Sequence, residues 1–131
     1  MTLEKKRLFI LDANALMHRA WHALPPLANP QGQIVNAVYG TMMVMMKLLE
    51  NEQPQACVAC WDTEAVTFRH EAYAKYKAQR KEQPDELYAQ IPLIQAGLAT
   101  LGVDSLELDG YEADDLIGTI ATRAHGEGWE V

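Results

Sequence analysis

The sequence contains little cysteine and no long hydrophobic run. Two cysteines, Cys57 and Cys60, are too few for a disulfide framework, which favours a reducing compartment, so we expect a cytoplasmic protein. No apolar run approaches the ~20 residues that cross a bilayer, and the N-terminus lacks a signal peptide's apolar region and cleavage site. These absences exclude disulfide-rich secreted proteins and membrane-spanning proteins.

Basic residues are also scarce. Eleven Lys and Arg against eighteen Asp and Glu give a net charge of −7, which taken alone argues against a nucleic-acid partner. The sequence has no glycine-rich phosphate loop and no Gly-x-Ser-x-Gly nucleophile motif. What remains is a chain of 131 residues, 49% apolar and 22% charged, which suits one globular domain with its own core.

Short apolar runs alternate with helical patterns. The runs at 8–11, 56–61 and 103–108 predict strands, and 129–131 opens a fourth; helices are predicted over 14–23, 36–50, 85–101 and 113–124, with Pro92 kinking or resetting the third of these. The 36–50 segment is apolar nearly all round and carries four methionines, which predicts a central buried helix with core methionines. The β-α-β alternation predicts an α/β fold with a parallel sheet, right-handed crossovers and helices on both faces.

Five carboxylates follow the predicted strands. Asp12 and Asp62 end the first two strands, and Glu112, Asp114 and Asp115 follow the third, so all five are expected at the carboxyl edge of the sheet. Oxygen ligands suit Mg²⁺ or Mn²⁺, and two such ions about 3.5–4 Å apart can bind the attacking water and the leaving oxygen in phosphodiester hydrolysis. Acidic residues in a first helical turn are equally well explained by the helix dipole, and the aspartates at the strand ends favour metal binding.

A basic stretch follows Asp62. Five of the eleven basic residues lie between Arg69 and Lys81, opposed only by Glu71 and interleaved with tyrosines. Cations that neutralise phosphates and rings that stack on unpaired bases are features of single-strand binding. A solvated basic helix has a similar composition, but the position of the stretch directly after Asp62 favours phosphate binding.

Two further spacings carry less weight. Cys57 and Cys60 are three apart on a predicted strand and so point to opposite faces, which indicates buried, inert thiols rather than a shared zinc ion. His18 and His22 are four apart on a predicted helix, but no third ligand is evident nearby.

Several motifs together resemble the 5′ nuclease, or flap endonuclease-like, superfamily, in particular the N-terminal 5′–3′ exonuclease domains of bacterial DNA polymerases I. The matching stretches are Leu8-Phe9-Ile10-Leu11-Asp12, His18-Arg19-Ala20-Trp21-His22-Ala23, Val38-Tyr39-Gly40, Trp61-Asp62, Thr67-Phe68-Arg69, Tyr76-Lys77-Ala78-Gln79-Arg80 and Gly110-Tyr111-Glu112-Ala113-Asp114-Asp115-Leu116-Ile117-Gly118-Thr119. The resemblance implies a PIN-like, resolvase-like fold with a basic arch at about 63–83. It also implies metal-dependent hydrolysis of DNA at 5′ ends and 5′ flaps, in replication and repair.

The resemblance also implies roles for individual residues. It makes Asp12, Asp62, Glu112, Asp114 and Asp115 the metal ligands, with Mg²⁺ or Mn²⁺ as cofactor and two ions in the complete domain. Lys77 and Arg80 would act in catalysis at the scissile phosphate, Tyr76 would stack near the terminal base, and Arg19 and Arg69 would contact phosphates. The implied partners are DNA with 5′ ends or flaps and the rest of a larger polymerase or nuclease chain.

The sequence also departs from that family's pattern. Ala13-Asn14 stands where glycine is usual after the first aspartate, and Lys81-Glu82 stands where prolines are common. The family's second acidic block, which follows the fourth strand, does not occur within residues 1–131, so we expect the chain to be a truncated, N-terminal part of the exonuclease domain. A catalytically incomplete module that binds DNA ends is therefore an alternative. An acidic-pocket signalling or phosphatase domain is disfavoured by the basic stretch and by the lack of a partner aspartate two residues after Asp12.

Overall fold

A three-stranded parallel sheet forms the centre of the computed structural model, which describes residues 5–63 and 85–131. The strands are β1 (Leu8–Asp12), β2 (Ala56–Cys60) and β3 (Asp104–Leu106), in the order β1-β2-β3. The register pairs Asp12 with Cys60 and Cys60 with Leu106, so the carboxyl ends of the strands lie level at one edge. The prediction of a parallel α/β fold is confirmed.

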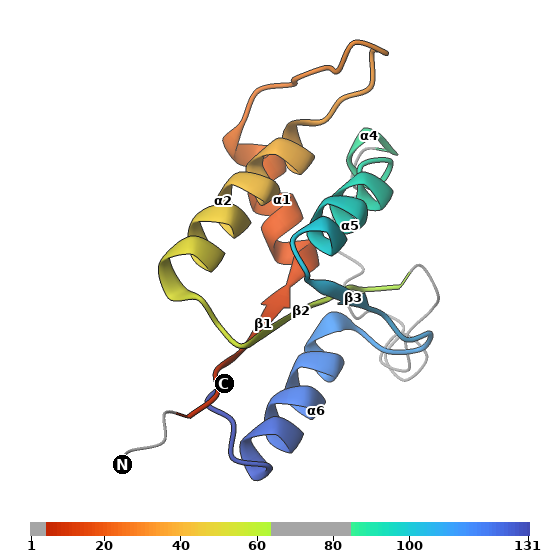
Figure 1. The fold of residues 1–131 in the computed structure, drawn as a ribbon. Helices are drawn as coiled ribbons and strands as arrows, with labels where there is room; N and C mark the ends of the chain where they lie inside the picture. Colours follow the sequence, from red (N-terminus) through yellow and green to blue (C-terminus); the bar gives the residue numbers. More distant parts are fainter. Residues whose placement is uncertain (1–4, 64–84) are drawn as a thin grey trace.

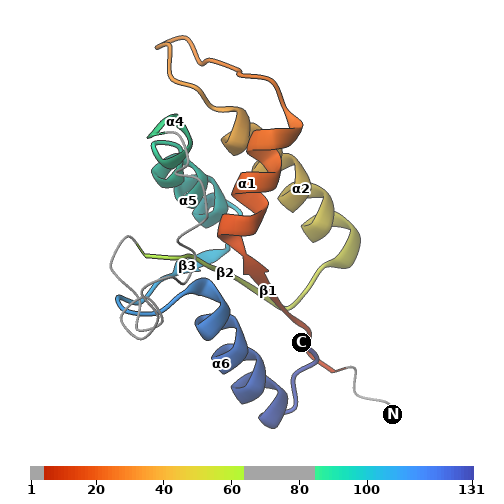
Figure 2. The same cartoon turned by 180° about the vertical axis from the view of Figure 1, so that it is seen from behind.

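Helices cover both faces of the sheet (Figures 1 and 2). On one side α1 (Ala13–Ala23) packs against α2 (Asn36–Glu52), and α2 packs against α5 (Ile91–Thr100). On the other side α6 (Ala113–Gly126) packs against β1 and β2. The core includes the fully buried side chains of Met17, Met45, Ala59, Ile94 and Leu98.

The predicted helix over 85–101 is divided in two. A short helix, α4 (Asp85–Tyr88), ends before Gln90, and Pro92 occupies the first turn of α5, where a missing N–H costs no helical hydrogen bond. Gln90 is fully buried, and its Oε1 accepts hydrogen bonds from the backbone N–H groups of Ala37 (2.8 Å) and Val38 (3.1 Å). Since no side chain at the N-cap position of α2 caps that helix, Gln90 supplies the acceptor from a distant part of the chain.

Only one face of α2 is buried, so the prediction of a central helix buried all round was wrong. Thr41 and Met45 are buried, but Tyr39, Met43 and Met46 are 52%, 42% and 54% exposed. The helix lies on the outside of its layer in Figure 1 and has α1 and α5 on its inner side. Apolar composition alone did not indicate which face would be covered.

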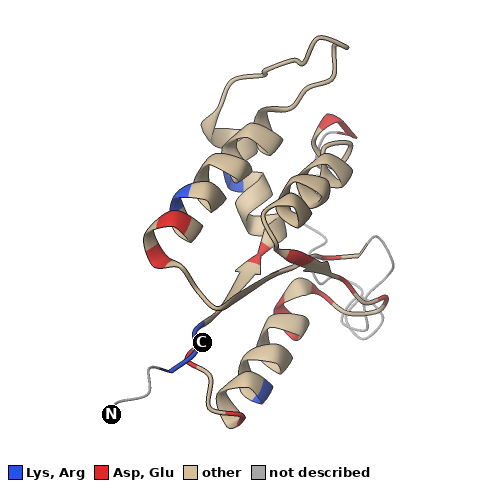
Figure 3. Cartoon of the chain, viewed as in Figure 1, with Lys and Arg blue, Asp and Glu red and all other residues tan. Residues whose placement is uncertain are grey.

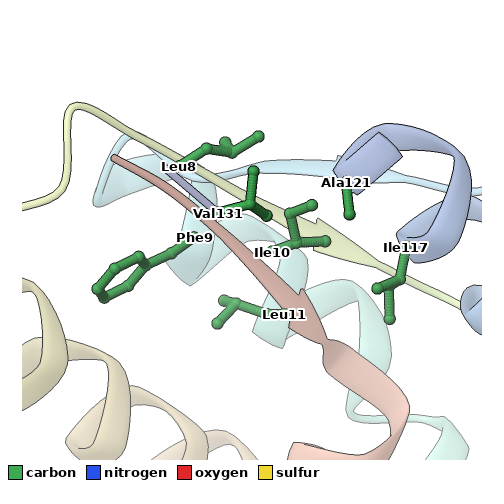
Figure 4. A pocket seen from close by; sticks show the side chains of 7 residues that line it. All are labelled: Leu8, Phe9, Ile10, Leu11, Ile117, Ala121 and Val131. Atoms are coloured by element: carbon green, nitrogen blue, oxygen red, sulfur yellow. The ribbon is translucent and has the colours of Figure 1, made fainter. Parts of the chain in front are cut away.

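The outer edge of β1 carries the last residues of the chain. Glu130 forms an isolated parallel bridge with Arg7, and the backbone N–H of Leu8 donates to the Glu130 carbonyl at 2.8 Å. The predicted fourth strand at 129–131 is present as this single bridge. A cavity of about 290 Å³ lies beside this edge, lined by Leu8, Phe9, Ile10, Leu11, Ile117, Ala121 and Val131. Ile10 points toward Ile117 of α6, whereas Phe9 points to the opposite side (Figure 4). All seven lining side chains are apolar, so none of them offers a charged or polar group to a phosphate or a cation.

Candidate metal and nucleic-acid site

Asp12 ends β1 and at the same time caps α1. Its Oδ1 accepts a hydrogen bond from the backbone N–H of Ala15 at 3.1 Å, in the manner of an aspartate at a helix N-cap. The side chain is half-buried at the carboxyl edge of the sheet. One residue thus ends the strand, starts the helix and places a carboxylate where open parallel sheets bind ligands.

Asp62 lies two residues beyond β2 and is bound from two sides. Its backbone N–H donates to Oδ1 of Asn14 in α1 at 2.7 Å. Its own Oδ1 accepts from the backbone N–H of Ala113, the first residue of α6, at 2.7 Å. These two bonds connect the start of α1, the end of β2 and the start of α6.

Glu112 and Asp115 form a reciprocal capping box at the start of α6. Asp115 Oδ2 accepts from the Glu112 backbone N–H at 2.9 Å, and the Glu112 side chain accepts from the backbone N–H of Asp115. Glu112 is only 4% exposed, whereas Asp114 is exposed. Helix capping is therefore one structural reason for this acidic turn, and it is separate from the dipole explanation. Figure 3 shows acidic residues in red both here and at the end of β1.

The carboxylates do not form a closed metal cluster. Among residues 5–63 and 85–131, no group of three or more His, Cys, Asp and Glu side chains could hold a metal ion. The donors nevertheless fit a hard divalent ion chemically, since Asp12, Asp62, Glu112, Asp114 and Asp115 offer only carboxylate oxygens. The fit thus rests on donor type and on position at strand ends and a helix start, not on a finished coordination shell.

Cys60 lies in register with Asp12 and is fully buried. Desolvation by burial, and secondarily the negative charge of Asp12, raise the pKa of the Cys60 thiol. Burial likewise raises the pKa of the Cys57 thiol. Both groups are therefore neutral thiols at neutral pH, and their predicted burial is confirmed.

The basic residues are divided between described and undescribed parts of the chain. Arg19 lies on α1 and is exposed. Arg69, Tyr76, Lys77 and Arg80 lie outside the described residues, as does the arch at 63–83 except for Thr63. Their roles therefore stay predictions from the sequence.

Sequence reasoning did not predict the contact of Asn14 with Asp62. The sequence shows Asn14 as a small polar residue two positions after an aspartate that ends a predicted strand, and Ala13-Asn14 departs from the family's usual glycine. The partner, 48 positions further along, becomes evident only once the strands are paired.

In comparisons with known proteins, residues 7–131 match the model of the 5′-3′ exonuclease, N-terminal resolvase-like domain. DNA polymerase I of Bacillus subtilis (strain 168) is 44% identical over 128 residues, which are 98% of this chain and 14% of the polymerase. A 5′-3′ exonuclease of Aquifex aeolicus (strain VF5) is 42% identical over 126 residues, 96% of this chain and 44% of the exonuclease. The chain thus spans less than half the length of either relative.

Two crystal structures share the fold. A T5 protein co-crystallised with metal ions superposes with a TM-score of 0.71 at 17% identity, over 91% of this chain and 45% of that one. A complex of the T5 flap endonuclease with DNA and metal ions gives a TM-score of 0.63 at 20% identity, over 94% and 46% of the two chains. Because the family model covers almost the whole sequence, the chain belongs to the family of N-terminal resolvase-like domains of 5′-3′ exonucleases.

Proposed function

We propose that residues 1–131 are the N-terminal part of a divalent-metal-dependent 5′–3′ exonuclease and 5′-flap endonuclease that hydrolyses DNA phosphodiesters. The observation that carries the proposal is the hydrogen bond between Asp62 and Ala113, which connects the carboxylate after β2 to the helix start that bears the other acids. Membership of the 5′-3′ exonuclease family supports the reaction class.

The acidic edge is the proposed metal site. Its ligands, direct or through water, would be Asp12, Asp62, Glu112, Asp114 and Asp115, with Mg²⁺ or Mn²⁺ as the ion. A bound ion would supply a polarised water and neutralise phosphate charge. The chain itself orients the carboxylates beforehand, since backbone N–H groups bind Asp12, Asp62 and Glu112.

DNA is the proposed substrate, with its phosphates bound by Arg19, Arg69, Lys77 and Arg80 and a terminal base stacked on Tyr76. Lys77 and Arg80, in the arch at about 63–83, would also stabilise charge that develops at the scissile phosphate. The concentration of basic residues between 69 and 81 supports this assignment, because phosphate neutralisation dominates affinity for DNA. The rest of a larger polymerase or nuclease chain is the proposed covalent partner.

A catalytically incomplete module that binds DNA ends is the second candidate. The observation in its favour is that the described part of the chain contains no closed group of three metal-ligating side chains. Such a module would bind DNA through the same basic residues and would not cleave it.

A chimera tests the proposal. Residues 1–131 replace the matching region of the Aquifex aeolicus exonuclease, and the chimera is incubated with 5′-labelled flap DNA and Mg²⁺. We expect cleavage that EDTA abolishes; a chimera that is folded and binds DNA but does not cleave it would contradict the proposal. Residues 1–131 alone are assayed in parallel, where cleavage would exclude the incomplete-module alternative.

A further inference from the structure

Asn14 connects two elements that carry proposed ligands. It is the second residue of α1, two positions after Asp12, and it is half-buried. Its Oδ1 accepts the backbone N–H of Asp62 at 2.7 Å. The side chain therefore reaches away from its own helix to the chain that leaves β2.

Two side chains at the start of α1, those of Asp12 and Asn14, form hydrogen bonds to different parts of the chain. Asp12 caps the helix by accepting from Ala15, which leaves the amide of Asn14 available to the neighbouring chain. Asparagine and aspartate side chains often form hydrogen bonds with backbone groups close to them in the sequence. The Asn14 side chain instead bonds a residue 48 positions away. An amide also accepts this hydrogen bond without adding a sixth negative charge to an edge that already holds five carboxylates.

The bond controls one of the two attachments of Asp62. The carboxylate is held at the start of α6 by Ala113, next to the buried Glu112, while the backbone of the same residue is held by Asn14. With both attachments, the direction of the Asp62 side chain relative to α6 is fixed. Without the Asn14 bond, Trp61 is still held, because its backbone N–H donates to the Leu106 carbonyl at 2.9 Å, but the backbone N–H of Asp62 loses its acceptor.

We propose that Asn14 is a positioning residue of the acidic edge: it fixes the backbone of Asp62, whose carboxylate accepts from the first residue of α6, before any ion binds. The effect on metal affinity rests on the proposed function, whereas the fixing of the Asp62 backbone does not. Residues that orient metal ligands through hydrogen bonds typically change affinity by about 10–100-fold when they are removed.

Three substitutions test the proposal in residues 1–131. Asn14→Leu keeps the approximate volume and removes the acceptor, Asn14→Asp keeps an acceptor, and Asn51→Leu removes an exposed amide at the far end of α2 as the control. Amide hydrogen exchange at Asp62 is measured without metal, and Mn²⁺ binding is measured by electron paramagnetic resonance of the free ion. Circular dichroism checks that each variant is folded.

For Asn14→Leu we expect faster exchange at Asp62 and about tenfold weaker Mn²⁺ binding. Asn14→Asp should retain slow exchange, and Asn51→Leu should match the unmodified chain in both measurements. Unchanged exchange at Asp62 in a folded Asn14→Leu variant would overturn the positioning role, as would unchanged Mn²⁺ affinity. If the unmodified chain itself binds no Mn²⁺, the proposed function loses its support, and the exchange measurement still decides the role of Asn14. Should Asn14→Leu fail to fold, loss of slow exchange in a folded Asn14→Ala variant would support the role and its retention would overturn it.

Discussion

The carboxylate of Asp62 accepts a hydrogen bond from the backbone N–H of Ala113, 51 positions further along the chain, at 2.7 Å. Ala113 is buried, so its N–H has little access to water as an alternative acceptor. The bond makes Asp62 a structural cap for α6 as well as a proposed metal ligand. Its charge and its hydrogen bonding can therefore be separated by substitution.

We predict that Asp62→Ala lowers the free energy of unfolding by about 1–2 kcal/mol, because it leaves a buried N–H without its acceptor. Asp62→Asn keeps an Oδ1 acceptor and should lose less stability. Urea unfolding of both variants measures this, with Asp104→Ala, an exposed aspartate on β3, as the control. Equal stability of the Ala and Asn variants would show that the bond contributes nothing.

Close packing of α1 against α2 at Gly40 gives a second prediction. A Cβ on Gly40 would lie 2.7 Å from Ala20 Cβ, whereas one on Gly97 would meet only the flexible Met42 side chain at the same distance. We expect Gly40→Ala to destabilise the protein by about 1–3 kcal/mol through overpacking. Gly97→Ala should be nearly neutral, because Met42 can move and alanine favours helix. Equal thermal melting temperatures for the two variants would contradict this.

The raised pKa values of the two thiols predict that the folded state loses stability at alkaline pH. Burial raises the pKa of Cys57 and Cys60 above their ordinary value of 9.0, so the unfolded chain releases these protons at lower pH than the folded chain. The contribution of the two buried thiols to the free energy of unfolding is fully present below about pH 9 and is lost as the pH rises through their folded pKa values. Urea midpoints at pH 8, 9 and 10 should therefore fall less steeply for the Cys57→Ala, Cys60→Ala double variant. The same pH slope with and without the thiols would refute the assignment.

How much could be predicted from the sequence depended on the range of the interactions. Local patterns sufficed for β1, β2, α1 and α6, because buried strands and capped helices have short-range signatures. The carboxyl edge followed from the parallel topology, which places Asp12 in register with Cys60. The exposed face of α2 could not be predicted, since it depends on which neighbours pack against an apolar helix.

The polar contacts show the same limit. Glu112 and Asp115 lie three positions apart, so their closeness was evident from spacing; the structure brings them together in a capping box, with Glu112 at the N-cap of α6. Asn14 bonds to a residue 48 positions away, and Gln90 bonds to the start of α2 across more than 50 positions; amide side chains give no sequence signal for such long-range contacts. Both were therefore missed.

The basic stretch predicts a measurable salt dependence. We expect the Lys77→Ala, Arg80→Ala double variant of residues 1–131 to bind 5′-flap DNA more weakly. The slope of log Kd against log salt concentration should decrease by about 2, because two phosphate contacts are lost. Arg123→Ala, an exposed cation in the last turn of α6, is the control and should leave the slope unchanged. An unchanged slope for the double variant would remove the stretch from the proposed interface.

The most direct test of the central claim, that the acidic edge holds a divalent ion for DNA cleavage, is Asp114→Asn in the exonuclease chimera. Asp114 is exposed and lies between the two capping residues, so this change should leave the fold intact. With flap DNA and Mg²⁺, we predict that the cleavage rate falls by at least about 100-fold, as expected when a metal's contribution of several kcal/mol is lost, while the Kd for DNA changes little. Asp104→Asn should cleave normally. Equal loss of cleavage and binding in Asp114→Asn, or unchanged cleavage, would contradict the account.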